Sequence, residues 1–386
     1  MPSNFVGRTV NNTQGRSEST DSARPSVREL TTLAATGLAQ MWDDEKQLFC
    51  FRLKQTPQGM VRQGHSRRYT IICLLGLSRL ETAEPKCSPI GIRTALDGLR
   101  RNAACIDNIG DLGLLLWLFA ISFPEHLEAV YSDRDVKGAL TRFREAREGR
   151  TMDLAWFLSG LAHAALAQRQ ELPDSTELAL KTYRLLKKNQ GGKGYFGHLA
   201  RSRSFAGALR GCIGSFADQV YPIYALTKFA QAYGNRTALD MARNCAEALC
   251  RVQGPLGQWW WHYDAWTGKV FQRHPVYSVH QHGMAPMALF ALGEATGLDL
   301  SEPIYKGLRW VYGNNELNRN LRDASSNVIW RSIYHSKNCK MYYREFLNFL
   351  RPIEKPELSD DLRISFECRP YEFGWLLYAF AGRDFD

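Results

Sequence analysis

The chain has 386 residues, of which 45% are hydrophobic and 12% aromatic, so it can bury a large core. Lys and Arg outnumber Asp and Glu by 49 to 39, but they lie in scattered clusters and not in a stripe interleaved with aromatics, so we do not expect nucleic acid as a partner. No run reaches the ~18 apolar residues of a membrane-spanning helix, and the polar residues 1–25 lack the apolar block of an export signal. We expect a disordered tail at residues 1–25 and a cytoplasmic protein.

Apolar residues recur at three- and four-residue spacing along most of the remaining chain, which predicts helices. In chain order these span residues 27–41, 69–80, 90–101, 112–123, 135–147, 152–168, 175–188, 216–233, 238–252, 279–296, 303–312, 341–350 and 371–380. Strand signals are few. The number of helices is close to the twelve of a closed ring of six helical hairpins.

A repeated phrase supports the ring. Gln190-Gly-Gly-Lys-Gly194-Tyr-Phe196 recurs 63 residues later as Gln253-Gly-Pro-Leu-Gly257-Gln-Trp259, each time between two predicted helices. The glycine can end a helix in the left-handed conformation, and the glutamine amide can bind backbone groups left unpaired at helix ends. A fixed period of this size predicts stacked helical hairpins, which we expect to form one domain over residues 26–386.

The same shift of 63 residues extends beyond the phrase. It aligns Ala225 with Ala288 in the middle of the following helix, and it aligns Asp218 with Gln281 and Gln219 with His282 at the start of that helix. The pattern therefore predicts that Asp218 and the two histidines beside Gln281 lie at equivalent starts of adjacent helices.

The Gln-x-x-x-Gly-x-aromatic phrase resembles the repeat of the terpenoid cyclase and protein prenyltransferase superfamily, an α/α toroid. A closely related toroid is used by six-hairpin glycosidases, uronyl hydrolases, polysaccharide lyases and sugar epimerases. The resemblance is strongest over residues 180–300 and implies an all-α fold, the (α/α)6 toroid of helical hairpins. Residues 259–264 (WWWHYD) and 280–289 (HQHGMAPMAL) are also similar to uncharacterised proteins encoded with exopolysaccharide biosynthesis genes.

The isoprenoid alternative requires its own acid. Terpenoid cyclases that protonate an alkene use the central acid of an Asp-x-Asp-Asp tetrad, and the aligned residues here are Ser215-Phe216-Ala217-Asp218, with Ala217 at the protonating position. Asp360-Asp361 is followed by Leu-Arg-Ile, so a diphosphate-binding Asp-Asp-x-x-Asp motif is missing as well. An isoprenoid cyclase would need another acid.

Sugar chemistry requires a pair of carboxylates, or an acid with a histidine or tyrosine, together with aromatic platforms. The candidate catalytic residues are Asp218, His280, His282 and Asp264. The candidate substrate-binding residues are Trp259, Trp260, Trp261, His262, Tyr263, Arg273, Tyr277 and Asp111. Asp218 could instead cap its helix, and one of the three indoles could cover the seam of a hairpin.

A metal site is not predicted. The nine cysteines form no Cys-x-x-Cys pair, which favours reduced thiols over zinc ligands. His280 and His282 are alternate residues at a helix start, so their side chains diverge. We expect neither a metal nor another cofactor.

These patterns predict a carbohydrate-active or sugar-modifying protein of exopolysaccharide biosynthesis, with a small-molecule or oligosaccharide substrate for which an anionic sugar would suit the basic charge. Hydrolase, lyase and epimerase chemistry remain open. The alternatives are an atypical terpenoid cyclase or prenyltransferase-like enzyme and a non-catalytic glycan-binding toroid. The oligomeric state is unknown from the sequence.

Overall fold

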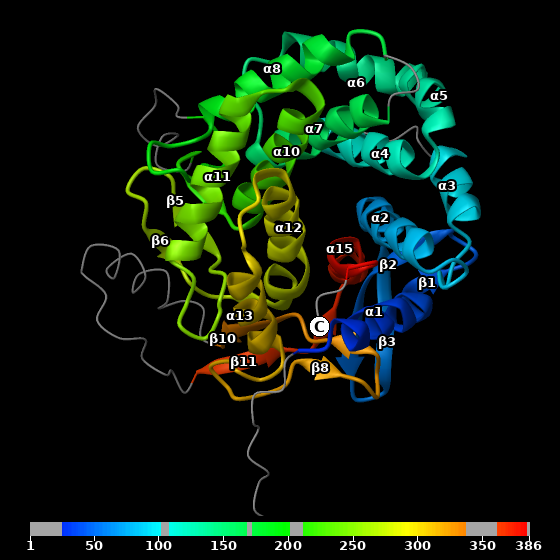
Figure 1. Cartoon of the computed structure of the whole chain (residues 1–386). Helices are drawn as coiled ribbons and strands as arrows, with labels where there is room; N and C mark the ends of the chain where they lie inside the picture. Colours follow the sequence, from blue (N-terminus) through cyan, green and yellow to red (C-terminus); the bar gives the residue numbers. More distant parts are fainter. Residues whose placement is uncertain (1–24, 102–107, 168–171, 201–210, 337–360, 384–386) are drawn as a thin grey trace, which may run out of the picture.

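Two concentric layers of helices form a closed ring in the computed structural model, which describes residues 25–101, 108–167, 172–200, 211–336 and 361–383 (Figure 1). The inner layer consists of α2 (Arg67–Ala83), α4 (Ile109–Ser122), α7 (Thr151–Leu166), α10 (Ala217–Tyr233), α12 (Ala285–Thr296) and α15 (Pro370–Phe380). The outer layer consists of α1 (Val27–Met41), α3 (Ile92–Arg101), α6 (Arg134–Glu145), α8 (Ser175–Lys188), α11 (Arg236–Arg251) and α13 (Ser301–Val311). Each inner helix contacts the next, and α15 contacts α2, so the inner layer closes on itself.

Short helices complete the connections. The 3-10 helix η2 (Pro124–His126) and α5 (Leu127–Tyr131) join α4 to α6, and a π-helix, η3 (His280–Met284), leads into α12. The helices predicted at residues 27–41 and 175–188 are confirmed with the same bounds, and the others that fall in described residues are confirmed to within three residues at each end. The helix predicted at residues 341–350 lies outside the described residues, as does nearly all of the predicted tail.

The two layers differ in sequence because they differ in burial. The inner helix α4 is apolar on all sides and is buried without interruption from Leu112 to Ala120. Glycines let the inner helices approach closely: a Cβ on Gly113 of α4 would lie 2.3 Å from the Cα of Phe157 in α7, and one on Gly76 of α2 would lie 2.2 Å from a carbonyl oxygen of α15. The outer helices bury only one face.

Four small sheets lie in the connections, and the sequence patterns did not predict them. The largest has the order β1 (Trp42–Asp43), β2 (Leu48–Thr56), β12 (Glu367–Cys368), with β3 (Gly59–His65) also paired to β2. The others pair β4 (Ile213–Ser215) with β5 (His262–Asp264) and β6 (Val270–Gln272), β7 (Val276–Tyr277) with β10 (Ser332–His335) and β11 (Leu362–Ser365), and β8 (Arg322–Asp323) with β9 (Val328–Ile329). Because β12 immediately precedes α15, its pairing with β2 ties the last inner helix to the first hairpin.

The repeated phrase serves the architecture. The side-chain amides of Gln190 and Gln253 each donate two hydrogen bonds. One goes to the carbonyl of the glycine in the same phrase, Gly194 or Gly257, and the other goes to a backbone carbonyl of the next outer helix. Each phrase therefore bridges two consecutive hairpins, as its recurrence predicted.

A second pair of glutamines sets the register of the repeat at the inner helices. Gln219 Oε1 accepts from the backbone N of Phe196 at 2.8 Å, and Gln281 Oε1 accepts from the backbone N of Trp259 at 3.3 Å. Gln219 is thus equivalent to Gln281, and the predicted alignment of Gln219 with His282 is wrong by one residue.

The π-helix η3 explains the shift. A π-helical turn holds one residue more than an α-helical turn, so one extra residue after Gln281 restores the spacing that aligns Ala225 with Ala288 further along. In the corrected register Asp218 is equivalent to His280.

Among the described helices, none combines the length and the apolar character that crossing a membrane would require.

Candidate active site

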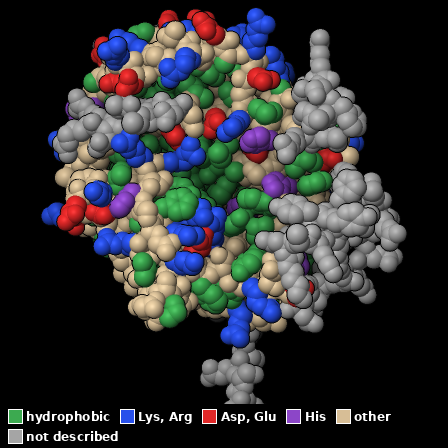
Figure 2. All heavy atoms as spheres, turned by 180° about the vertical axis from the view of Figure 1, so that it is seen from behind, with side chains coloured by type: hydrophobic (Ala, Val, Ile, Leu, Met, Phe, Trp, Pro, Cys, Tyr) green, Lys and Arg blue, Asp and Glu red, His purple; other side chains and the backbone are tan. Residues whose placement is uncertain are grey.

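The starts of the inner helices gather on one face of the ring. The inner helices α2 and α15 run parallel, since Tyr69 contacts Tyr371 near their starts and Arg79 contacts Tyr378 further along both helices. Figure 2 shows the face turned away from the viewer in Figure 1: its centre is hollowed, the floor is hydrophobic, and basic, acidic and histidine side chains surround it. We call the helix starts around this hollow the mouth.

Two carboxyl groups from neighbouring inner helices interact electrostatically in the mouth, and their surroundings differ. Arg68 of α2 donates to both oxygens of Asp111 of α4, with Nε–Oδ1 at 2.5 Å and Nη2–Oδ2 at 3.0 Å. Asp153 of α7 is their neighbour, because a Cβ on Gly110 would lie 2.8 Å from Asp153 Oδ1. Burial raises the pKa of Asp153, although Arg68 and Arg150 oppose the shift. One carboxylate is thus held in a salt bridge, and the other carboxyl binds a proton more readily than an ordinary aspartate does.

Helix caps fix these groups. The Asn108 side chain accepts from Asp111 N at 2.9 Å and begins α4, and Ser66 likewise begins α2 just before Arg68. Asp111 was a predicted site residue, whereas Asp153 was missed. A signal was available: Asp111, Asp153 and Glu372 each occupy the third position of an inner helix that is otherwise strongly apolar.

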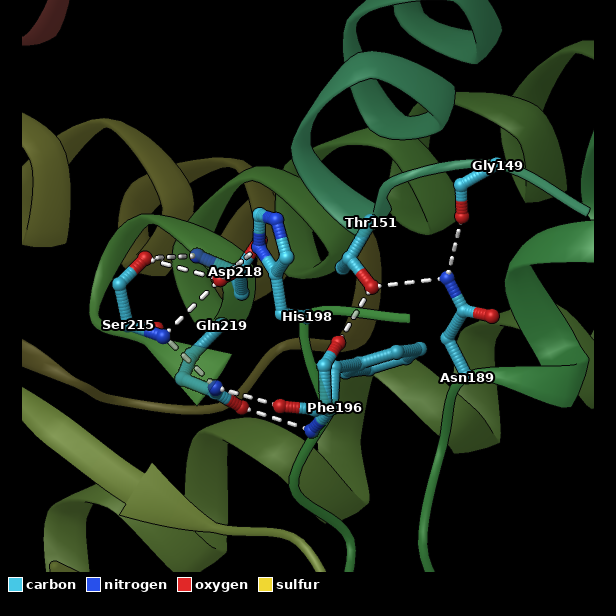
Figure 3. Close-up of polar contacts among 9 residues, drawn as sticks. Gly149, Thr151, Asn189, Phe196, His198, Ser215, Asp218 and Gln219 are labelled. Atoms are coloured by element: carbon cyan, nitrogen blue, oxygen red, sulfur yellow. Dashed lines mark hydrogen bonds and ion pairs between the residues drawn. The ribbon is translucent and has the colours of Figure 1, made fainter. Parts of the chain in front are cut away.

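Asp218 lies at the start of α10 and binds the imidazole of His198 (Figure 3). Its Oδ2 accepts from the backbone N and the hydroxyl of Ser215, each at 2.9 Å, and lies 3.3 Å from His198 Nδ1. Asp218 is 2% exposed, whereas the His198 side chain is 44% exposed. The hydrogen bond that the His198 ring donates to Asp218 raises the pKa of His198, and Asp153 adds to the effect. His198, which the sequence analysis missed, is therefore the solvent-facing member of an oriented Asp–His pair.

A strap formed by residues 196–198 positions this pair between α7 and α10. Gln219 binds both the N and the O of Phe196 at 2.8 Å, and Thr151 at the start of α7 donates its hydroxyl to the carbonyl of Gly197 (Figure 3). The backbone N of Thr151 also donates to the carbonyl of His198 at 3.0 Å. The strap therefore fixes His198 relative to two inner helices, one of which carries Asp153.

An aromatic group continues around the mouth. Trp261 stacks on His280 at the start of η3, with ring centroids 6.1 Å apart, and packs against Tyr277 and His262 at 4.7 Å. Trp261, His262 and Tyr277 are half-buried, and burial lowers the pKa of His262. His280 is buried and its pKa falls to about 3, so it is a neutral imidazole.

In the last part of the mouth, three guanidinium groups form ion pairs with one carboxylate. Glu367 binds Arg52, Arg331 and Arg369, and although burial opposes the change, these charges, led by Arg331, lower its pKa. Glu372 at the start of α15 is fully buried behind them, and burial raises its pKa to about 7 despite Arg331 and Arg369. This part of the mouth therefore carries excess positive charge.

Aromatic side chains also line the inner helices just below the charged groups. Trp156 of α7 lies under the Arg68 guanidinium at 5.3 Å and packs edge-on against Tyr221 of α10, which in turn contacts Trp375 of α15. Trp156, Tyr221 and Trp375 are buried, so they form the packed floor beneath the mouth.

Several predicted site residues lie elsewhere. Trp259, Trp260 and Tyr263 are buried in the packing between hairpins, and of the three tryptophans only Trp261 belongs to the mouth group. Asp264 closes the β5–β6 turn, accepting from Trp266 N and the Thr267 hydroxyl at 2.8 Å, which gives a catalytic role no support.

Two further predicted residues are also set back from the mouth group. His282 is fully buried inside η3, where burial lowers its pKa to about 3. Arg273 stacks over Trp260, 5.2 Å from the ring centre, in the connection before η3. The structure thus brings Asp218, His262, His280, Trp261, Tyr277 and Asp111 to the mouth and gives Asp264, His282 and the other buried residues packing roles.

No protein-family model matches the chain, and no curated protein matches its sequence. Its fold is similar to solved structures. One is a possible member of the GH105 family from Klebsiella pneumoniae, at 12% identity and a TM-score of 0.60 over 98% of each chain. A possible GH105 member from Salmonella enterica matches at 13% identity and a TM-score of 0.59, over 95% of this chain and 96% of that one.

An unsaturated glucuronyl hydrolase from Bacillus sp. GL1, responsible for the degradation of glycosaminoglycan, is similar at 13% identity and a TM-score of 0.57, covering 91% of this chain and 95% of its own. At such low identity these matches show the fold alone. The predicted fold class is confirmed: the chain has an (α/α)6 toroid fold, like these solved structures.

Proposed function

We propose that this protein is a carbohydrate-active enzyme that hydrolyses a glycosidic bond of an anionic oligosaccharide in the mouth of the toroid. The observation that carries the proposal is the pair Asp111 and Asp153. Adjacent carboxyl groups whose surroundings differ in this way are typical of sites that need one proton donor and one carboxylate.

In this mechanism Asp153 donates its proton to the departing glycosidic oxygen as the bond from that oxygen to the anomeric carbon breaks. Asp111 stays bound to Arg68 and stabilises the positive charge that develops on the sugar ring. Water adds to the anomeric carbon, and its second proton returns to Asp153. The His198–Asp218 pair is next to Asp153 and is the second candidate for proton transfer, with Asp218 acting through His198.

The rest of the mouth fits the same substrate class. Trp261 and Tyr277, both half-buried, supply ring faces on which a sugar can stack. The excess positive charge around Glu367 favours a carboxylate or sulfate on the sugar. A glucuronyl hydrolase among the fold neighbours is a further reason to test uronates. The similarity of residues 259–264 and 280–289 to proteins encoded with exopolysaccharide genes supports a role in polysaccharide biosynthesis.

The test is a screen of uronate-containing and neutral oligosaccharides, with products analysed by mass spectrometry in ¹⁸O-labelled water. Hydrolysis adds one labelled oxygen to a product, whereas a lyase adds none. We expect Asp153→Asn to lower kcat by about 100-fold or more and Asp135→Asn, an exposed first-turn control on α6, to leave it unchanged. Binding of a glycan with no turnover of any substrate would favour the non-catalytic toroid instead.

A further inference from the structure

A second pocket lies at the other end of the inner helices, away from the mouth. Arg79 of α2, Lys228 of α10 and Glu294 of α12 line it together with Arg383, which follows α15. Lys228 lies ten residues beyond Asp218 on the same helix, which is ~15 Å along its axis. The two sites therefore share inner helices but not residues.

The inner side of this pocket is closed by two tyrosines. The hydroxyls of Tyr224 and Tyr378 lie 2.7 Å apart, and each binds a second buried side chain: Tyr224 binds His163 at 2.8 Å, and Tyr378 accepts from Trp117 Nε1 at 3.1 Å. This network fills the centre of the ring between the pocket and the mouth.

The described lining of the pocket carries three basic side chains and one acidic side chain. Glu294 is bound by Arg383. In the described parts of the chain neither Arg79 nor Lys228 has a carboxylate partner within ion-pair distance: Arg79 lies over the ring of Tyr378 at 5.0 Å, and Lys228 donates to the neutral Gln231 at 3.0 Å. Burial lowers the pKa of Lys228; Glu294 opposes the change, and Arg79 and Arg383 add to it.

Interaction with helix ends does not account for these charges. Basic residues in the last turn of a helix stabilise its negative end, but the last turns of α2 and α10 contain none, because Arg79 and Lys228 lie one turn earlier. Only Arg383 has a capping role, since its Nε donates to the carbonyl of Ala379 at 2.8 Å. Glu294 attracts all three cations but balances only one positive charge, so gathering Arg79 and Lys228 beside Arg383 costs free energy unless a further anion joins them.

We propose that this pocket binds a phosphate group, either as the free ion or as a sugar phosphomonoester. The Arg79 guanidinium, the Lys228 ammonium group and the Arg383 nitrogen that binds neither Ala379 nor Glu294 can together match the oxygens of a tetrahedral oxyanion. With Glu294 counted, the pocket has an excess of two positive charges, which complements a phosphate of nearly two negative charges.

Isothermal titration calorimetry of the full chain with sodium phosphate and with glucose 6-phosphate, at constant ionic strength, tests the proposal. We expect saturable binding of at least one of the two, and the tighter ligand identifies the source of the phosphate. Arg79→Gln and Lys228→Gln should each weaken binding about tenfold, as expected for the loss of one charge-assisted hydrogen bond. Lys188→Gln, an exposed control on α8, should bind like the wild type.

Two more variants guard against misfolding and against binding in the mouth. Glu294→Gln removes the competing carboxylate and should tighten binding several-fold, a gain that an unfolded variant could not produce. Arg68→Gln alters the mouth and should leave phosphate affinity unchanged. The proposal is overturned if neither ligand binds, if Glu294→Gln weakens binding, or if Arg68→Gln abolishes it while Arg79→Gln does not.

Discussion

Arg68 binds both carboxylate oxygens of Asp111 and lies close enough to Asp153 to influence its protonation. This guanidinium reaches from α2 to the starts of α4 and α7, so a single side chain distinguishes the two carboxyl groups. The pH dependence of the proposed reaction should therefore respond to Arg68.

Replacing Arg68 with Gln removes a positive charge that lowers the pKa of Asp153. The pKa should rise, and because Asp153 must be protonated to act as the acid, the basic limb of the kcat profile should move to higher pH. Arg68→Lys keeps the charge and should move the limb less. An unchanged limb in Arg68→Gln would show that the titrating acid is not next to Arg68.

Asp218→Asn should lower the pKa of His198, because the hydrogen bond to Asp218 is the main cause of its elevation. Titration of the imidazole signals by NMR measures this directly. Asp299→Asn, an exposed turn variant, is the matched control. If activity falls in Asp218→Asn while kcat survives in Asp153→Asn, the His198–Asp218 pair carries the proton transfer.

Glu372 should make the protein less stable as the pH rises. Its folded-state pKa of about 7 lies above the ordinary 4.5, so the folded state holds a proton that the unfolded state has lost. Stability is then present below pH 4.5 and declines as the pH rises toward 7, by up to about 3 kcal/mol.

Urea denaturation of Glu372→Gln checks this expectation. Glutamine can still accept from the backbone N of Arg369, so the helix cap is kept. The variant should lose less stability than the wild type between about pH 5 and about pH 8. Glu128→Gln on the surface of α5 is the control and should follow the wild type. Parallel pH curves for Glu372→Gln and the wild type would contradict a protonated Glu372.

Gly257 should be irreplaceable in the repeated phrase. Its φ is +100°, and an added Cβ would lie 2.0 Å from the carbonyl oxygen of Lys306 in α13. Gly234 also has a positive φ, +66°, but no atom lies within 4 Å of its added Cβ. Gly257→Ala should therefore cost about 3 kcal/mol or more and Gly234→Ala about 1 kcal/mol, measured by denaturation. Equal losses would show that the contact with α13 is unimportant.

The sequence by itself determined the helices and their ring. Apolar spacing located them to within a few residues, because burial of a helix face leaves a local and periodic pattern. The phrase that contains Gln190 and Gln253 revealed the repeat, since a device that bridges consecutive hairpins must recur with each hairpin. Some strands escaped this reasoning because they pair residues far apart, as Glu367 with Lys54, and others because they are hairpins of only two residues a strand, as β8 with β9.

Only the tertiary structure decided which polar side chains meet. Asp153 begins an otherwise apolar helix and Asp264 follows three tryptophans, so either pattern could belong to a site, yet the first interacts with Asp111 and the second closes a turn. The equivalence of Asp218 with His280 was hidden for a related reason: the extra residue of η3 changes the register only at the helix start. Local patterns report the burial of a residue's own segment, whereas a site depends on the relative positions of several helix starts, which only the closed ring establishes.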